Sequence, residues 1–150
     1  MTNPRTRGFT LIEMLIVVTI IGIVSGFGLP RMNELMKRES TRSARREVLT
    51  LVSRARNTAA QRGCRSTLHI SASTDQVWVT SCKLTGTGRD TIGTVLNTLT
   101  RYKVLLAADA DSLPFAANSL GLGTGTISFT FTRDSYSNTM RVSSVGRATW

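Results

Sequence analysis

The chain has 150 residues and a formal net charge of +10 at pH 7, and its length suits one folded domain plus an additional segment. Its single histidine, His69, lies in a predicted strand, where a lone histidine is usually a packing or surface residue. No paired carboxylates share a convincing helical or strand register, so the sequence predicts no enzyme and no bound metal or other cofactor. The basic excess predicts a solvated face, or contact with anionic headgroups or nucleic acid.

An apolar run extends from Phe9 to Leu29, and Glu13 is its only strongly polar side chain. As a helix the run is ~32 Å long at ~1.5 Å per residue, which is enough to cross the hydrocarbon core of a membrane. A secretory signal peptide is one alternative, but no small-residue cleavage site follows the run. A plain membrane anchor is another, but it leaves Glu13 unexplained, because a carboxylate in a spanning helix is costly and marks function.

Small residues and a proline interrupt the end of this run. Gly22 and Gly26 have the spacing that lets membrane helices approach closely, and glycine also weakens a helix. Pro30 removes a backbone donor and is expected to kink the helix. Glycine is common in membrane helices in any case, so a packing role for the pair and the absence of one both stay open.

An amphipathic helix is predicted over residues 30–62, with Gly63 as its end. The second half of this helix carries apolar side chains at positions i, i+3, i+4, i+7 and i+11, so this half is expected to pack on a folded domain. The residues between Lys37 and Glu47 are mostly polar and are expected to be exposed. The predicted buried face consists of Val48, Leu51, Val52, Ala55 and Ala59.

Positive charge is concentrated on this second helix. Nine basic and three acidic side chains lie between Arg31 and Arg62. Two basic residues precede the apolar run and six follow it closely, so the positive-inside rule alone would place the C-terminal part of the chain in the cytoplasm.

Short β-prone segments, separated by Gly, Ser, Thr and Asp, occupy residues 63–150. Together with the helix they predict an α+β fold, in which a long N-terminal helix packs on a small antiparallel β-sheet. A glycine-rich stretch at residues 120–126 precedes a strand and opens no helix, so we interpret it as a turn. The predicted strands are residues 64–70, 76–82, 101–106, 126–132 and 139–145.

The first two strands allow two hairpin registers, which differ by one residue and therefore swap faces. One register pairs Cys64 with Cys82. The other pairs Leu68 with Val79 around a tighter loop and leaves Cys64 opposite Lys83. A β-bulge would reconcile the two registers.

The stretch RGFTLIEMLIVVTIIGIV resembles the leader and N-terminal helix of type IV pilins and type II secretion pseudopilins. In that family a short basic leader ends in Gly, Phe follows, and Glu is the fifth residue after the cut, which Gly8, Phe9 and Glu13 match. The resemblance implies that a prepilin peptidase cuts between Gly8 and Phe9 and N-methylates Phe9. It also implies that Glu13 pairs with the new α-amine of a neighbouring subunit, since either charge alone is costly in lipid. Pro30 lies where many members have a kink.

The same resemblance implies an inner-membrane protein that crosses once, with a cytoplasmic N-terminus and a periplasmic C-terminal domain. This topology is the opposite of the one that the positive-inside rule gives. We follow the leader, because the peptidase requires Gly8 to be cytoplasmic. Two cysteines in a small exported domain then predict a disulfide between Cys64 and Cys82, and two buried thiols are the alternative. The implied parts are the leader 1–8, the transmembrane helix 9–29, the amphipathic helix 30–62 and the β-rich domain 63–150.

The C-terminal half is similar to H-type minor pseudopilins and FimT-type minor pilins, through its glycine-rich turn, alternating strand and final Gly146-Arg147. This implies a subunit that assembles with other pilins or pseudopilins into a filament or its tip, within type II secretion or a type IV pilus. A FimT-type pilin that binds DNA for uptake is one alternative, although Thr149 stands where that pattern has a second arginine. A single-pass protein with a headgroup- or nucleic-acid-binding helix and no filament is another. Candidate DNA contacts are Arg101, Lys103, Arg133, Arg141 and Arg147.

Overall fold

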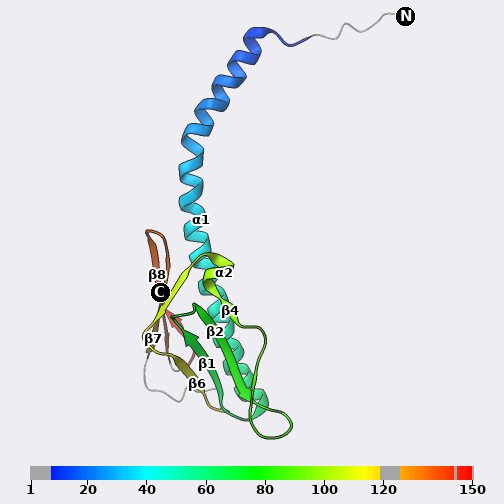
Figure 1. Cartoon of the computed structure of the whole chain (residues 1–150), viewed down its shortest axis with the longest axis vertical. Helices are drawn as coiled ribbons and strands as arrows, with labels where there is room; N and C mark the ends of the chain where they lie inside the picture. The colour runs from blue at the N-terminus through cyan, green and yellow to red at the C-terminus, as the bar shows by residue number, and fades with distance from the viewer. Residues whose placement is uncertain (1–7, 119–125, 144, 150) are drawn as a thin grey trace, which may run out of the picture. The chain divides into compact units, whose positions relative to one another are not determined.

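One long helix, α1 (Leu11–Arg62), opens the fold, and short strands follow it. The computed structural model describes residues 8–118, 126–143 and 145–149, without the side chains of residues 27–30. The chain divides into a first unit, residues 1–36, and a second unit, residues 37–150, and α1 contributes to both (Figure 1).

The first unit presents its apolar helix to the surroundings. The large apolar side chains between Leu11 and Val24 are 47–84% exposed. Among the described residues no single helix is long and apolar enough to cross a membrane. The segments Leu11–Gly26 and Arg31–Arg62 meet that test only when taken together, by length and composition.

The second half of α1 supplies one side of the core of the second unit. All five residues of the predicted buried face are at most 4% exposed, which confirms that face. The face continues N-terminally to Ala44 and Thr41, which are fully buried, so the expectation that this part of the helix is exposed is wrong at these two positions. The helix ends before Gly63, whose φ is 63°, and the N–H of Cys64 donates to the carbonyl of Ala59 at 3.3 Å. This is the hydrogen bond of a Schellman cap, in which glycine takes the left-handed conformation without steric cost.

The first sheet of the second unit has the strand order β3-β2-β1-β6, and β4 also pairs with β2. Leu68 lies opposite Val79, so the tighter of the two predicted hairpin registers is confirmed and the register that pairs Cys64 with Cys82 is wrong. Alternate side chains of β1 and β2 enter the core, as a half-buried antiparallel sheet requires. The strands are β1 (Ser66–Ser71), β2 (Gln76–Cys82), β3 (Arg89–Thr91), β4 (Leu96–Asn97) and β6 (Ser112–Phe115).

The second sheet has the order β5-β7-β8-β9. Its inward side chains include Phe129, Phe131 and Met140, which are fully buried. They join the helix face and the inner side of the first sheet in one apolar cluster, so a single core holds the second unit together. The strands are β5 (Leu105–Ala108), β7 (Thr126–Arg133), β8 (Tyr136–Ser143) and β9 (Ala148–Thr149).

The predicted α+β class is confirmed, and the strands divide between two sheets. The predicted strand at residues 101–106 is wrong in its first part, where the chain forms the short helix α2 (Thr98–Tyr102). The side-chain oxygen of Asn97 caps α2 by accepting from the N–H of Thr100 at 2.7 Å, and Lys103 ends it with a φ of 59°. The predicted glycine-rich turn falls largely on residues 119–125, which lie outside the described residues.

Candidate functional site

The predicted cleavage junction lies just before α1. Gly8, Phe9 and Thr10 have no regular secondary structure, and the side chain of Phe9 is 76% exposed. Irregular, exposed backbone is the kind that proteolytic enzymes reach most easily. The peptide bond between Gly8 and Phe9 is therefore accessible in this conformation.

Glu13 has a hydrogen-bonding role that the sequence reasoning missed. The N–H of Glu13 donates to Oγ1 of Thr10 at 3.3 Å, and Oε2 of Glu13 accepts from the N–H of Thr10 at 3.4 Å. This reciprocal pair is a capping box, and its sequence signal, Thr-x-x-Glu before an apolar run, was visible. The carboxylate thus supports the first turn of its own helix, but within the described residues this one long hydrogen bond leaves most of its charge without compensation.

The glycine pair of the helix is open on its free side. A Cβ added at Gly22 or at Gly26 would meet no heavy atom within 4 Å, apart from the helix's own backbone and chain neighbours. Another helix therefore has room to approach closely at these two positions, as small residues permit. The side chain of Pro30 lies outside the described part of the chain, so its kinking role stays a prediction.

Cys64 and Cys82 form a disulfide, with their Cα atoms 6.3 Å apart. The bond does not need the rejected hairpin register, because β1 begins only at Ser66 and Cys64 precedes the ladder. Cys64 therefore reaches Cys82 from the turn after α1, without a bulge. Near the bond, Nη1 of Arg62 donates to the carbonyl of Cys82 and lies 3.9 Å from a carboxylate oxygen of Asp90. The disulfide and this arginine join the end of α1 to the end of β2.

An aromatic pair lies on the side of the first sheet that faces away from the core. His69 and Trp78 are directly opposite on β1 and β2, and their rings stack with centroids 5.2 Å apart. Nε2 of His69 is 2.9 Å from Oγ1 of Thr80, which accepts from Nε of Arg89 at 3.2 Å. The Thr80 hydroxyl can then donate to an unprotonated His69. Burial, and secondly the positive charge of Arg89, hold the pKa of His69 below its usual 6.5.

Acid should weaken the fold through this histidine. Because the pKa of His69 is lower in the folded chain than the unfolded value of 6.5, the unfolded chain binds the proton more tightly. The contribution of His69 to stability should be fully present above about pH 6.5 and should be lost as the pH drops from there toward the folded pKa. NMR titration of the imidazole and urea midpoints on both sides of that range will check this. Arg89→Gln should raise the pKa of His69, and Arg141→Gln, on the other sheet, should not. An unchanged pKa of His69 in Arg89→Gln would show that the charge of Arg89 does not contribute to the shift.

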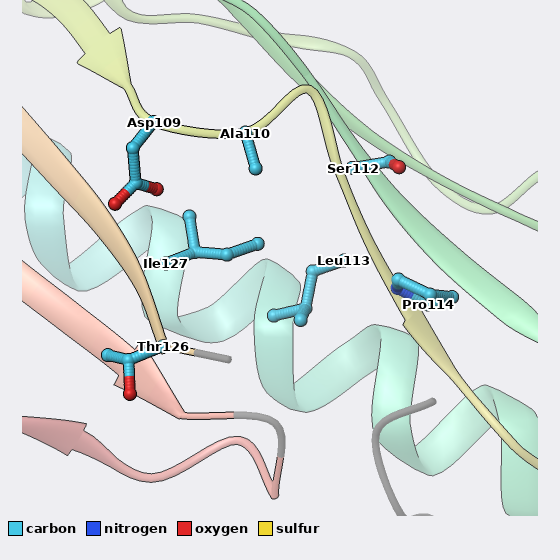
Figure 2. A pocket seen from close by; sticks show the side chains of 7 residues that line it. All are labelled: Asp109, Ala110, Ser112, Leu113, Pro114, Thr126 and Ile127. Atoms are coloured by element: carbon cyan, nitrogen blue, oxygen red, sulfur yellow. The ribbon is translucent and has the colours of Figure 1, made fainter. Parts of the chain in front are cut away.

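A groove of about 400 Å³ opens between the two sheets (Figure 2). Among the described residues that line it, Asp109 is the only ionisable one, and its Oδ1 accepts from the N–H of Ser128 at 2.9 Å. Within the same described residues no three His, Cys, Asp or Glu side chains come close enough to hold a metal ion. The groove therefore assembles neither paired catalytic carboxylates nor a metal site from these residues. Its lining residues are Asp109, Ala110, Ser112, Leu113, Pro114, Thr126 and Ile127.

The basic part of α1 is partly engaged by the β7–β8 hairpin. Nζ of Lys37 lies 3.2 Å from Oδ2 of Asp134, and the guanidinium of Arg38 lies 5.7 Å from the ring centroid of Tyr136. Arg45 donates to a side-chain oxygen of β8 at 3.4 Å. These basic side chains hold the hairpin to the helix, so this stretch is not simply the solvated face that the charge run predicts.

The five candidate DNA contacts come from different elements. Arg101 lies in α2 and is 2.9 Å from Oε1 of Glu47, and Arg133, at the end of β7, donates to the hydroxyl of Ser40. Lys103 is the C-terminal cap of α2, Arg141 lies on β8, and Arg147 lies just before β9. Two of the five are thus already bound to other side chains, and a DNA role for the set stays a prediction.

Comparison with known proteins gives three findings. Residues 3–29 match the prokaryotic N-terminal methylation motif. The type IV major pilin protein PilA of Myxococcus xanthus (strain DK1622) is 43% identical over 49 residues, which are 33% of this chain and 22% of that protein. The match therefore spans only about a fifth of that relative's length.

The third finding concerns the fold. Two crystal forms of the type IV minor pilin FimU of Pseudomonas aeruginosa (strain PAO1) superpose with TM-scores of 0.60 and 0.55. The aligned regions cover 77% and 72% of this chain and 90% of each FimU chain, at 13% identity. At this identity the likeness shows a shared fold.

Proposed function

With its N-terminal methylation motif and the fold of a type IV minor pilin, the chain belongs to a type IV pilin-like family, and we propose that it is a minor subunit of a type II secretion pseudopilus or a type IV pilus. It acts by assembling into the filament or its tip, in support of protein secretion or pilus biogenesis. It performs no chemistry of its own. The observation that carries the proposal is the exposed apolar helix, which begins beside the Gly8–Phe9 junction and bears Glu13.

Exposed apolar surface of this extent needs an environment other than water. Contiguous apolar patches larger than a few hundred Å² mark contact with a membrane or a partner. We propose that lipid covers residues 9–29 before assembly, and that helices of other subunits cover them afterwards, packing at Gly22 and Gly26. The protein is then held in the inner membrane with its N-terminus in the cytoplasm and residues 63–150 in the periplasm, where the disulfide is stable.

Glu13 acquires its full role only after processing. Cleavage between Gly8 and Phe9 by a prepilin peptidase creates an α-amine at Phe9, which is a cation at the edge of the apolar helix. The capping box with Thr10 leaves the carboxylate of Glu13 largely uncompensated, so the Phe9 amine of a neighbouring subunit is its natural counter-ion. The partners that this proposal names are the prepilin peptidase and the other pilins or pseudopilins of the filament.

Two alternatives have less support in the structure. The first alternative is a protein that forms no filament and binds lipid headgroups or nucleic acid through its basic helix. It would need basic side chains that are available for binding, but Lys37, Arg38 and Arg45 contact the β7–β8 hairpin. DNA binding by the β-rich domain would rely on residues 63–150, which carry only eight basic side chains against five acidic ones.

The genes next to the one that encodes this protein distinguish the two filament systems. Genes for a secretin and a secretion ATPase indicate type II secretion, and genes for pilus retraction and competence indicate a type IV pilus.

Processing provides the first test of the proposed function. The protein isolated from membranes of its host should begin at Phe9 and carry an N-methyl group, because the junction is exposed and matches the leader pattern. Mass spectrometry of the N-terminal peptide, with and without the host's prepilin peptidase, measures this directly. An intact Met1 in cells with an active peptidase would rule out a processed pilin-like subunit.

A further inference from the structure

The outward side of strands β1, β2 and β3 carries a group of side chains that have no role in the proposed assembly through α1. Their neighbours along β1 and β2, among them Leu68 and Val79, are buried in the core, so these side chains point away from it. We call this surface the Trp78 face. It consists of Thr67, His69, Trp78, Thr80, Arg89 and Thr91.

Arg89 is held in one position on this face. Its Nη2 donates to Oγ1 of Thr67 at 2.9 Å and to the carbonyls of Arg65 and Thr80 at 3.4 Å, and its Nε donates to Oγ1 of Thr80. Nη1 has no partner among the described residues, and no described carboxylate pairs with this guanidinium. A guanidinium group that is already immobilised loses little further conformational entropy when it binds an anion. Arg89 is therefore ready to receive a carboxylate or phosphate oxygen.

Trp78 gives the face an apolar centre, two residues along β2 from Thr80, which Arg89 contacts. Its ring is half-buried and is fixed by the stacked ring of His69. Tryptophan and arginine are the side chains that most often dominate protein interfaces, in patches whose centre is poor in charge. The remaining members of the face are threonines, so Arg89 is its one permanently charged group. A single-stranded nucleic acid would instead need cationic side chains repeated along a path beside the stacking rings.

The surroundings of Arg89 favour an acidic partner. The side chain of Lys83 runs beside Gly88, and both Lys83 and Arg65 are exposed. The acidic residue of β3, Asp90, already lies 3.9 Å from Nη1 of Arg62. The positive charge at this end of the face is therefore not neutralised within the described chain. Complementary charge across an interface steers association and fixes its register.

We propose that the Trp78 face is a contact surface for a neighbouring protein subunit that places a carboxylate on Arg89 and an apolar side chain on Trp78. The inference rests on the proposed function, because it takes that neighbour to be another pilin-like subunit. It differs from the helix contacts in lying on the β-rich domain and in depending on a charge pair outside the membrane.

Site-specific crosslinking in the host tests the proposal with the full chain. A photo-crosslinking amino acid replaces Thr91, which is exposed on β3, and in a matched control replaces Thr139, which is exposed on β8 of the other sheet. The position-91 probe should link to a protein whose mapped peptide contains an Asp or Glu. Trp78→Ala and Arg89→Glu should each reduce this product about tenfold or more, the scale of an interface hot spot. Thr139→Glu should leave it unchanged.

A charge swap decides whether Arg89 itself makes the contact. Replacing the mapped acidic residue with arginine should restore the crosslink in Arg89→Glu but not in Trp78→Ala. Retention of the disulfide and a cooperative thermal transition will show that the variants fold. A product that does not depend on Trp78 and Arg89, or one that nuclease destroys, would overturn the proposal. So would the absence of any product from a chain found in filaments. A chain that crosslinks as expected but never enters a filament would instead refute the proposed function.

Discussion

Glu13→Val should exclude the chain from assembled filaments while leaving its insertion into the membrane intact or improved. A charged carboxylate in a spanning helix is costly, even in the first turns where Glu13 lies, so valine should make insertion easier. What the variant loses is the counter-ion for the Phe9 amine of the neighbouring subunit. That amine would then be a buried cation without a partner, which is strongly unfavourable. Immunoblots of the sheared filament fraction and of membranes, with wild-type neighbouring subunits, measure both effects.

The capping box adds a second function for Glu13, and two further variants separate the two functions. Glu13→Gln keeps the capping box, because glutamine is accepted at this position, but it removes the negative charge. Thr10→Val removes the capping hydroxyl, at a cost of about 1 kcal/mol in helix stability, and keeps the carboxylate. Glu13→Gln should therefore fail to assemble, and Thr10→Val should assemble with at most a modest loss. The reverse result would mean that Glu13 matters as a helix cap and that no intersubunit ion pair forms.

The helix and the first hairpin could be predicted because their patterns are long and regular. The buried face at Val48–Ala59 repeats with the helical period over three turns, and Gly63 marks the end that the left-handed cap requires. In the hairpin, the alternation of Leu68 and Ile70 with polar neighbours allowed only two registers. The decision between them depended on where β1 starts, and strand ends have no clear sequence signal.

Short elements held by tertiary contacts could not be predicted. The segment of α2 is rich in threonine and ends in tyrosine, which favours a strand, and only the capping side chain of Asn97 indicates a helix. The strand β6 contains Pro114, which argues against a strand, yet β6 lies at the edge of its sheet, where proline is tolerated. The strand β3 is only three residues long.

The candidate site was likewise visible only in part. Gly8, Phe9 and Glu13 form a local motif, so the sequence identified them without any knowledge of the fold. The capping box was also local and could have been found. The position of Arg89 beside Thr67 and Thr80 depends instead on the pairing of three strands, so no spacing in the sequence reveals it.

Replacing both Cys64 and Cys82 with serine should lower the free energy of unfolding of the β-rich domain by about 3 kcal/mol. The disulfide joins residues 18 apart, and a loop of that size removes about this much conformational entropy from the unfolded chain in the usual model. The loss is large relative to the 5–15 kcal/mol of a typical domain. Urea unfolding of the full chain in detergent, followed through the aromatic residues of the β-rich domain, measures it.

Reduction provides the matched control for this pair of substitutions. Wild-type protein unfolded in the presence of a reductant should approach the stability of the double serine variant, which itself should not respond to the reductant. The loss should also appear locally, since the bond ties the end of α1 to the end of β2, and amide exchange around Ala59 and Cys64 should become faster. In the host, the thiols should resist alkylation until reduced, because an exported domain reaches an oxidising compartment. Thiols that react freely there, with equal stability in both forms of the protein, would show that the apolar core alone holds this end of the helix.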